Sequence, residues 1–178
     1  MTDQGLAVFT TAIGHCGIAW GDRGVVGVCL PGRSAESTRA AVRKQCPEAV
    51  ETEPPQHIAH AMDEIVALLR GERLDLTDIE LDLEGMPEFH RKVYEVARAI
   101  PPGKTLTYGE VAARIGMPGS AQAVGQALGH NPIPIIVPCH RVLAAGGKMG
   151  GFSAPGGVDT KRRILVIEGA RPDEPTLF

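Results

Sequence analysis

Cys139 and His140 are adjacent in the sequence, and together they could act as a nucleophile and its base. A thiol attacks carbon only after it loses its proton, which a neighbouring imidazole can take directly or through a water molecule. The imidazole needs a partner on its other nitrogen, and Glu168 can serve if the last helix packs its C-terminal end against Pro138. On this interpretation we expect His140 and Glu168 to lower the pKa of Cys139. The alternative is a buried cysteine and a hydrogen-bonded histidine that merely adjoin, and the pair alone favours that alternative.

Residues 131–138, Asn-Pro-Ile-Pro-Ile-Ile-Val-Pro, must position this pair. Each proline lacks the N–H that a regular central strand needs. We therefore expect an extended, buried segment that delivers Cys139 and His140 at a fixed bend. A glycine-rich loop follows over residues 146–157.

The last helix is predicted to start near Asp159 and to end at Gly169, with Glu168 in its final turn. Its basic run, residues 161–163, is expected on a solvated face, with contact to phosphate as the alternative. The expected buried residues of this helix are Ile164, Leu165 and Ile167.

Two short helices precede the Cys139 segment, after an amphipathic helix predicted over residues 89–100. Thr107-Tyr-Gly-Glu110 has the spacing of a capping box, which predicts a helix to about Ile115. Ser120 is expected to cap a second helix over residues 121–130. The two helices and their Gly-Met-Pro-Gly turn have the form of a helix-turn-helix, which can be a DNA-binding motif or only a packing unit.

The first half of the chain predicts a small α/β unit in which we identify no chemistry. Strands are expected over residues 6–12 and 17–30, the second interrupted by a glycine at position 24, and helices over residues 34–44 and 58–69. Cys29 lies in an apolar strand, which favours packing over catalysis. A boundary near Gly85 divides the chain into domains 1–86 and 87–178.

The charges are distributed unevenly over these 178 residues, whose net charge is -3. Residues 1–86 carry 7 basic and 14 acidic side chains, whereas residues 87–178 carry 11 basic and 7 acidic ones. This asymmetry favours a polyanionic partner for the C-terminal half, although unevenly charged solvated surfaces would give the same counts.

Nothing at the start of the sequence has the pattern of a signal peptide, and no apolar run approaches the roughly 20 residues of a membrane helix. We therefore expect a cytoplasmic protein that does not bind membranes. The cysteines form no C-x-x-C pair, so we expect free thiols and no metal site. The four cysteines are Cys16, Cys29, Cys46 and Cys139.

The segment Pro138-Cys-His-Arg-Val142 resembles the active-site signature of the O(6)-alkylguanine-DNA alkyltransferases. The resemblance covers about residues 89–170, including Tyr108, Asn131-Pro132 and the glycine-rich loop, and it is loose before them. It implies an α+β fold, with a small ribonuclease-H-like α/β N-terminal domain and a mostly helical, winged-helix-like C-terminal domain that carries the helix-turn-helix. The implied activity is irreversible, single-turnover transfer of an alkyl group from O(6)-alkylguanine in DNA to a cysteine, without a cofactor.

The resemblance implies a role for each matching catalytic position. Cys139 is the nucleophile and alkyl acceptor, His140 is the base acting through a water, and Glu168 orients the imidazole. Asn131 would hold the turn between the recognition helix and the cysteine. Tyr108 would donate a hydrogen bond or a proton to the departing guanine.

The resemblance also implies how guanine is recognised. The backbone N–H of Ser153 would bond the oxygen that loses its alkyl group, while the carbonyls of Cys139 and Val142 would accept from the exocyclic amine. Phe152 stands where the family often has tyrosine and would form a wall of the pocket. The other residues expected at the substrate or DNA surface are Ser120, Ala121, Arg141 and Lys161.

The implied partner is double-stranded DNA, bound through its minor groove by a monomer, with the alkylated guanine flipped out of the stack. In the family, an arginine near the start of the recognition helix fills the gap that the base leaves. This sequence has Gln122 there, which has no charge for a phosphate and stacks less well. We therefore expect weaker base flipping with the chemical apparatus intact.

Two other functions remain open. The first is a non-catalytic alkyltransferase-like protein that binds lesions and flags them for other repair machinery. Gln122 is compatible with that function, whereas Cys139 argues against it. The second is a cysteine hydrolase that uses Cys139, His140 and Glu168. Adjacent cysteine and histidine make its geometry awkward, and no oxyanion-hole motif is evident.

Overall fold

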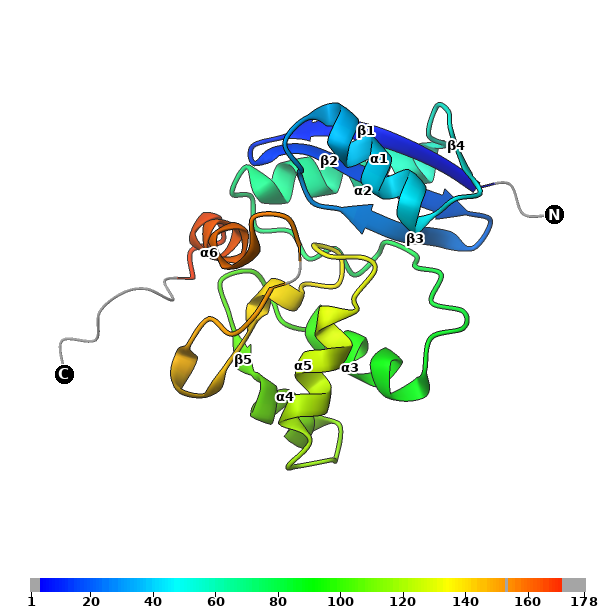
Figure 1. The fold of residues 1–178 in the computed structure, drawn as a ribbon. Coiled ribbons are helices and arrows are strands. Elements are labelled where there is room, and N and C mark those ends of the chain that lie inside the picture. Colours follow the sequence, from blue (N-terminus) through cyan, green and yellow to red (C-terminus); the bar gives the residue numbers. More distant parts are fainter. Residues whose placement is uncertain (1–3, 153, 171–178) are drawn as a thin grey trace.

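The structure is a computed structural model, and it describes residues 4–152 and 154–170. The first part of the chain forms a mixed four-stranded sheet with strand order β3-β2-β1-β4, in which β1–β3 are antiparallel and β4 runs parallel to β1 (Figure 1). The elements of this part are β1 (Gln4–Thr11), β2 (Gly14–Gly21), β3 (Gly24–Cys29), α1 (Ala35–Gln45), β4 (Ala49–Glu51) and α2 (Gln56–Leu69).

Helices α1 and α2 cover opposite faces of this sheet, because successive side chains of a strand point to opposite sides. Leu6 of β1 packs in one apolar cluster with Val42 of α1. The next residue, Ala7, belongs to the other cluster, which includes Ile58 and Ile65 of α2. The sheet therefore lies between two apolar layers and forms a rigid base for the second part of the chain.

Gly24 is required where the connector to the second part runs beside β3. Its φ is +130°, and a Cβ there would lie 2.4 Å from the carbonyl oxygen of Glu80. The close approach lets the Val25 N–H donate to that oxygen at 3.0 Å, while the Asp82 N–H donates to the Val25 carbonyl at 2.9 Å. The strand expected over residues 17–30 is divided into β2 and β3 by a hairpin turn at residues 22–23, just before this glycine. Gly24 itself is needed for the close approach of the two backbones.

The second part is mostly helical, which confirms the α+β class (Figure 1). The predicted capping box is present, because Thr107 and Glu110 exchange side-chain and backbone hydrogen bonds at the start of α4. A two-stranded parallel sheet pairs the entry of α4 with the segment after Cys139. The elements are α3 (Glu88–Arg98), β5 (Leu106–Thr107), α4 (Tyr108–Arg114), α5 (Ala121–Gly129), η1 (Cys139–Arg141), β6 (Val142–Leu143), η2 (Ala145–Gly147) and α6 (Gly157–Ile167). No helix in the described ranges is long and apolar enough to cross a membrane.

The two parts meet at the carbonyl oxygen of Pro132. It accepts hydrogen bonds from the Val28 N–H of β3 at 3.0 Å and from the Gln45 side chain of α1 at 2.9 Å. Elsewhere, the Arg163 guanidinium of α6 donates to the carbonyl of Ala12 at 3.0 Å. The N-terminal sheet thus fixes the start of the segment that leads to Cys139. The domain division at residue 86 stays a prediction.

The segment 132–138 is buried as expected, but it is not extended. The Val137 N–H donates to the Ile133 carbonyl at 2.9 Å, so the chain closes into a turn. Ile135 has φ +74°, a conformation that is strained for a β-branched residue. Strain of this kind persists only where the surrounding structure imposes it, and it is typical of functional sites.

Two further predictions on the helices were only partly right. Ser120 is the N-cap residue of α5, as predicted, but its hydroxyl donates to the Met117 carbonyl at 2.5 Å and accepts from no backbone N–H of the helix. In α6, Ile167 is only partly buried. The buried residues of α6 are instead Lys161, Ile164 and Leu165.

Candidate active site

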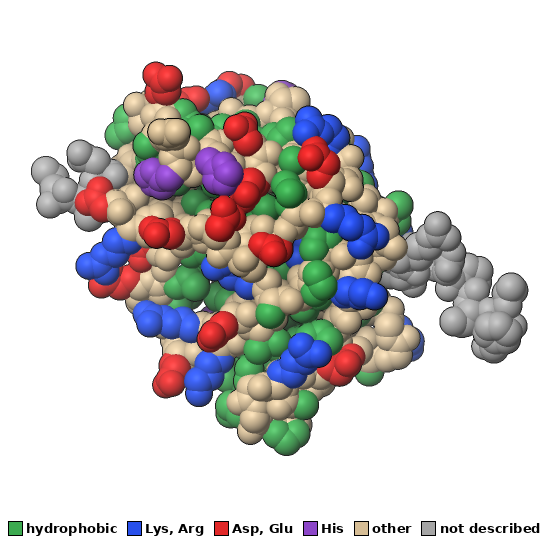
Figure 2. Space-filling model, turned by 180° about the vertical axis from the view of Figure 1, so that it is seen from behind, with side chains coloured by type: hydrophobic (Ala, Val, Ile, Leu, Met, Phe, Trp, Pro, Cys, Tyr) green, Lys and Arg blue, Asp and Glu red, His purple; other side chains and the backbone are tan. Residues whose placement is uncertain are grey.

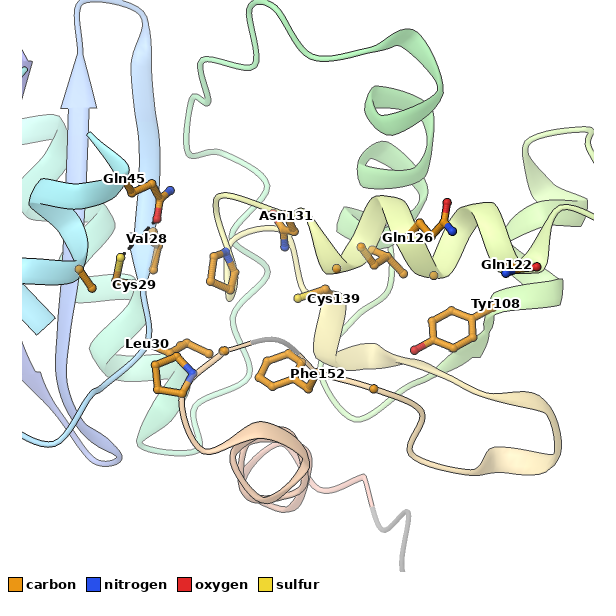
Figure 3. A pocket seen from close by; sticks show the side chains of 18 of the residues that line it. Val28, Cys29, Leu30, Gln45, Tyr108, Gln122, Gln126, Asn131, Cys139 and Phe152 are labelled. Carbon is orange, nitrogen blue, oxygen red and sulfur yellow. Dashed lines mark hydrogen bonds between the residues drawn. The ribbon is translucent and has the colours of Figure 1, made fainter. Parts of the chain in front are cut away.

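Cys139 lies in a cavity of about 770 Å³ between the N-terminal sheet and the helices of the second part (Figure 3). Tyr108 and Gln122 line one end, and β3 with α1 lines the other. The Cys139 side chain lies between these ends with its residue only 8% exposed. A group can therefore reach the sulfur only by entering the cavity, and a base stacked inside a duplex cannot do so.

The bend that carries Cys139 is fixed by Asn131. Its side-chain amide donates to the Val137 carbonyl at 2.9 Å, and its oxygen accepts from the Ile133 N–H at 2.9 Å. The same side chain hydrogen-bonds the Cys139 thiol, which lowers the pKa of that thiol. Asn131 therefore holds the turn and touches the sulfur at the same time.

His140 points away from solvent and meets Glu168 at the end of α6. Its Nε2 lies 3.0 Å from both carboxylate oxygens, and both side chains are fully buried. The Arg141 guanidinium donates two hydrogen bonds to the same carboxylate, from Nε at 3.0 Å and from Nη2 at 2.7 Å. Its Nη1 donates to the carbonyl of Ile100 at 2.6 Å. The bidentate pair holds Glu168 in one orientation, and Glu168 in turn holds the imidazole.

The buried network sets the charge of each group. Burial raises the pKa of Glu168, but its hydrogen bonds and charge contacts with His140 and Arg141 outweigh burial and lower the pKa to about 2. Burial lowers the pKa of His140, which its contact with Glu168 only partly offsets. His140 is therefore neutral at physiological pH, with Nε2–H donating to the carboxylate. Its Nδ1 is buried and has no hydrogen-bond partner among the described residues, so that nitrogen can accept a proton.

The expected lowering of the Cys139 pKa is wrong. Burial raises the pKa of this thiol, and the hydrogen bond from Asn131 and the charge of Lys161 only partly offset the effect. A thiol in an apolar cavity loses solvation when it ionises, and His140 carries no positive charge that would replace it. The site therefore holds a neutral thiol next to a neutral imidazole.

Lys161 and Arg141 were both expected at the DNA surface, and both are buried. The Lys161 ammonium donates to the Val142 carbonyl at 2.8 Å and reaches the Gly151 carbonyl at 3.5 Å. It also lies 5.9 Å from the centre of the Tyr108 ring, and burial lowers its pKa to about 8. The physical reason for the correction is that backbone carbonyls and Glu168 satisfy these cations inside the protein, so neither can contact a phosphate.

Most of the remaining predicted residues line the cavity. Tyr108, Gln122, Ala121 and Phe152 all line the cavity, whereas Ser120 does not. Burial raises the pKa of Tyr108, so its hydroxyl keeps its proton and can donate it. Ser153 lies outside the described residues.

The two carbonyls predicted to face the exocyclic amine each hold one hydrogen bond already. The Cys139 carbonyl accepts from the Val142 N–H, and the Val142 carbonyl accepts from the Lys161 ammonium. A carbonyl oxygen has two lone pairs, so one remains on each.

The sequence pattern did not reveal that the N-terminal sheet lines the site. Cys29, expected only to pack, is partly exposed to the cavity and donates to the Gln45 side chain at 3.4 Å (Figure 3). Leu30 and Val28 of the same strand also line the cavity. These residues carry no motif, so only the three-dimensional structure brings them to Cys139.

The other cysteines are less suited to act as nucleophiles. Burial raises the pKa of Cys16 and of Cys29 to about 11, and it also raises that of Cys46. None of the three has a histidine–carboxylate pair beside it in the described structure. All four cysteines are free thiols, as expected.

One group of potential metal ligands, His60, Glu64 and Asp78, lies elsewhere on the surface, with ligand atoms within 4.8 Å of one another. The His60 Nε2 contacts Glu64 at 3.1 Å and Asp78 at 3.3 Å, and these carboxylates raise the pKa of His60.

The surface charge follows the division seen in the sequence. On the face turned away in Figure 1, Asp and Glu side chains gather over the N-terminal elements, whereas Lys and Arg side chains lie mainly along the sides and over the lower, C-terminal part (Figure 2). The exposed C-terminal part is therefore the better surface for a polyanion.

The arrangement resembles known proteins along most of the chain. Residues 88–170 match the family model described as 6-O-methylguanine DNA methyltransferase, DNA binding domain. A methylated-DNA--protein-cysteine methyltransferase of Mycolicibacterium paratuberculosis is 48% identical over 128 residues, which are 71% of this chain and 75% of that protein. The protein of the same name from Methanothermobacter thermautotrophicus is 39% identical over 153 residues, 86% of this chain and 78% of that protein.

Solved structures give the same result for the fold. The crystal structure of Mycobacterium tuberculosis OGT in complex with DNA superposes with a TM-score of 0.73 and 37% identity, covering 93% of this chain and 94% of that chain. The O6-methylguanine-DNA methyltransferase of Pyrococcus kodakaraensis gives a TM-score of 0.72 at 25% identity, covering 94% of this chain and 99% of that chain.

Proposed function

Because the chain belongs to the 6-O-methylguanine DNA methyltransferase family, we propose that Cys139 is its alkyl acceptor. The protein transfers a methyl group from O6-methylguanine in DNA to a cysteine. The observation that supports the assignment most strongly is the buried Glu168–His140 pair, because His140 directly follows Cys139 in the chain and its Nδ1 has no hydrogen-bond partner among the described residues. It favours a common role of Cys139 and His140 over the alternative in which the two residues merely adjoin.

The reaction proposed is a displacement at the alkyl carbon. His140 Nδ1 takes the Cys139 proton through a water molecule, and Glu168 stabilises the imidazolium that forms. The sulfur forms a bond to the alkyl carbon while the bond from that carbon to O6 breaks, and its electrons pass to the guanine. Tyr108 donates a hydrogen bond or a proton to the departing base. The guanine needs one proton in all, and the thiol proton carried by His140 supplies it directly or replaces the one that Tyr108 gave. The thioether cannot be reversed by any group in the site, so each molecule reacts once.

Because the Cys139 sulfur is buried, the guanine must leave the duplex to reach it. This flipping costs about a few kcal/mol. We propose that α5, which begins beside the cavity at Ala121, lies in the minor groove with Gln122 in the gap, and that a monomer carries out repair. Asn131 holds the bend that carries Cys139 in a fixed position relative to this helix. The predicted contact of Ser153 with O6 belongs to the same proposal. Ser120, at the start of α5 and outside the cavity lining, is proposed to contact the DNA.

The test of the proposed function is a mass measurement. The whole protein is incubated with excess duplex carrying one O6-methylguanine and then analysed intact and as peptides. One methyl group should be gained per molecule, on the peptide that contains Cys139, and no second turnover should follow. Methyl on a peptide of Cys16, Cys29 or Cys46, or continued turnover, would refute the assignment.

Gln122 gives a second prediction, because it is exposed at the cavity mouth where an arginine is expected from the resemblance. Gln122→Arg should raise the rate with duplex DNA severalfold, since a guanidinium adds charge near phosphates and stacks better, each worth about 1 kcal/mol. It should change reaction with free O6-benzylguanine little, because no base is extruded. Gln122→Ala should harm the duplex reaction more than the free-base reaction.

The control is Gln126, one turn further along α5, which is exposed and lines the same cavity but lies farther from the start of the helix. Gln126→Ala should lower the duplex rate less than Gln122→Ala does. If neither Gln122 variant alters the duplex rate, another residue opens the stack.

A further inference from the structure

A cluster of three potential metal ligands lies outside the Cys139 cavity. His60 and Glu64 are one turn apart on α2, so both side chains lie on the same side of that helix. Asp78 comes from the connector, residues 70–87, and the three ligand atoms lie within 4.8 Å of one another. On the face shown in Figure 2, histidine side chains lie beside Asp and Glu side chains. Because Asp78 is 18 positions after His60, no local sequence pattern indicates the cluster.

The spacing of the ligand atoms suits a small divalent metal ion. Zn–N and Zn–O bonds are about 2.0–2.1 Å long, so two ligands of a tetrahedral zinc ion lie about 3.3 Å apart. The His60 Nε2 lies 3.1 Å from a Glu64 oxygen and 3.3 Å from an Asp78 oxygen. A zinc ion can therefore be bound with little movement of the side chains, with a water molecule in the remaining position.

Glu64 gives an independent indication that a cation belongs here. Its second oxygen, Oε2, is buried and has no hydrogen-bond partner among the described residues. The Glu64 carboxylate also faces that of Asp78, although its side chain is only 18% exposed. Two carboxylates held together in a partly buried place repel each other, and a protonated His60 balances only one of them. A divalent cation supplies two charges and can bind either Glu64 oxygen.

Arg98 of α3 holds the connector in place around Asp78. The Arg98 Nη2 donates to the carbonyls of Leu76 and Ile79 at 2.9 and 3.0 Å. These two residues flank Asp78, so the bonds fix the turn that carries the third ligand. The charge of Arg98 also attracts Asp78, but no hydrogen bond joins the two side chains in the described structure. The Asp78 carboxylate thus stays directed at His60.

We propose that His60, Glu64 and Asp78 bind a divalent transition-metal ion, Zn²⁺ in particular, which fastens the connector to α2. The imidazole ligand favours this class over Mg²⁺ and Ca²⁺, which prefer oxygen ligands alone. The expectation that the chain has no metal site was based on its cysteines, and no cysteine belongs to this cluster. The inference is independent of the proposed function of Cys139, since none of the three residues lines its cavity.

The experiment measures Zn²⁺ binding to the whole, untagged protein by isothermal titration calorimetry, after a chelator has removed bound metal. The wild type should bind one Zn²⁺ per molecule. His60→Ala and Asp78→Asn should weaken binding about a hundredfold or more, since loss of an outer-shell partner alone typically costs about 10- to 100-fold. Both side chains are 58% exposed, so the variants should fold. The controls His57→Ala and Asp63→Asn change exposed residues of α2 outside the cluster and should bind as the wild type does.

Thermal unfolding gives a second readout. At a free Zn²⁺ concentration about a hundred times the wild-type Kd, the midpoint of wild-type unfolding should rise by roughly 5–10 °C, because the ion binds the folded chain. His60→Ala and Asp78→Asn should lose nearly all of this rise, whereas His57→Ala should keep it.

Substitution of Co²⁺ for Zn²⁺ reports the type of ligand, since nitrogen and oxygen ligands give no thiolate charge-transfer band. If the wild type does not bind Zn²⁺, the three side chains form an ion-paired cluster only and the inference is wrong. Undiminished binding by His60→Ala, a Co²⁺–thiolate band, or Mg²⁺ binding as tight as that of Zn²⁺ would equally overturn it.

Discussion

Replacing Cys139 with alanine is expected to abolish alkyl transfer to the protein while DNA carrying O6-methylguanine is still bound. The substitution removes one buried sulfur and leaves the backbone of the bend, Asn131 and the His140–Glu168 pair in place. Affinity for DNA comes mainly from phosphate contacts on the surface, which Cys139 does not touch. Intact mass after incubation with the methylated duplex reports the loss, and fluorescence anisotropy of a labelled duplex reports the binding.

Cys46→Ala is the matched control, since Cys46 is equally buried but packs between α1 and the sheet. It should keep stoichiometric transfer. If Cys139→Ala still gains a methyl group, the acceptor has been assigned wrongly. If the wild type and Cys139→Ala bind the methylated duplex alike and neither gains a methyl group, the protein is a lesion-binding protein.

Secondary structure could be predicted well wherever local physics decides it. The helix after Ser34 and the helix after Thr107 both begin at capping boxes whose partners lie three residues away. Such short-range hydrogen bonds are visible in a sequence. In contrast, β4, β5 and β6 have only two or three residues, too few to show a periodicity, and their pairing partners are distant. They were not predicted.

The residues of the candidate site also fall into two groups, those whose position the sequence predicted and those whose position it did not. The motifs pointed to Cys139, His140 and Glu168, and in the structure His140, the residue after Cys139, contacts Glu168. Charged residues were placed wrongly, because a basic residue in a helix is usually solvated. Lys161 bonds a carbonyl 19 positions away, and Arg141 bonds one 41 positions away. No local pattern indicates such partners.

The part of the cavity lining that comes from the N-terminal sheet could not be predicted, for a related reason. The Gln45 side chain bonds the Pro132 carbonyl across 87 positions, and Gln45 lies in a segment without a recognisable motif. Packing of one part of the chain on the other, not residue type, brings Cys29 and Leu30 to the cavity. Their role could therefore be inferred only from the structure.

Glu168→Gln is expected to lower the rate of alkyl transfer by about a hundredfold or more and to destabilise the fold. The carboxylate is the common partner of His140 and Arg141, and removal of one member of a buried ion pair costs about 3–5 kcal/mol. Loss of a positioned base typically costs a factor of about 10² to 10⁴. Glu88→Gln is the control, because the Glu88 side chain is 85% exposed and should affect neither quantity.

The pH dependence of stability follows from the lowered pKa of Glu168. Its pKa falls from an ordinary value of 4.5 to about 2 on folding. A carboxylate whose pKa is lowered in the folded state contributes its full stability above pH 4.5 and loses it as the pH falls toward 2. The difference in unfolding free energy between the wild type and Glu168→Gln should therefore be constant above pH 5 and shrink below pH 4. Chemical denaturation at several pH values measures it.

The rate profile separates a catalytic relay from a merely structural ion pair. His140 is active when neutral, so the wild-type rate should fall as acid protonates it, below its ordinary pKa of 6.5 because burial lowers the value. Its contact with Glu168 raises that pKa, so Glu168→Gln should shift the acid limb to lower pH while lowering the plateau. Glu168→Asp keeps the charge and should restore part of the plateau if the protein folds. A Glu168→Gln protein that is folded, slow and unshifted in its acid limb would mean that Glu168 holds the structure of the bend without tuning His140, and the base would then have to be sought elsewhere in the cavity.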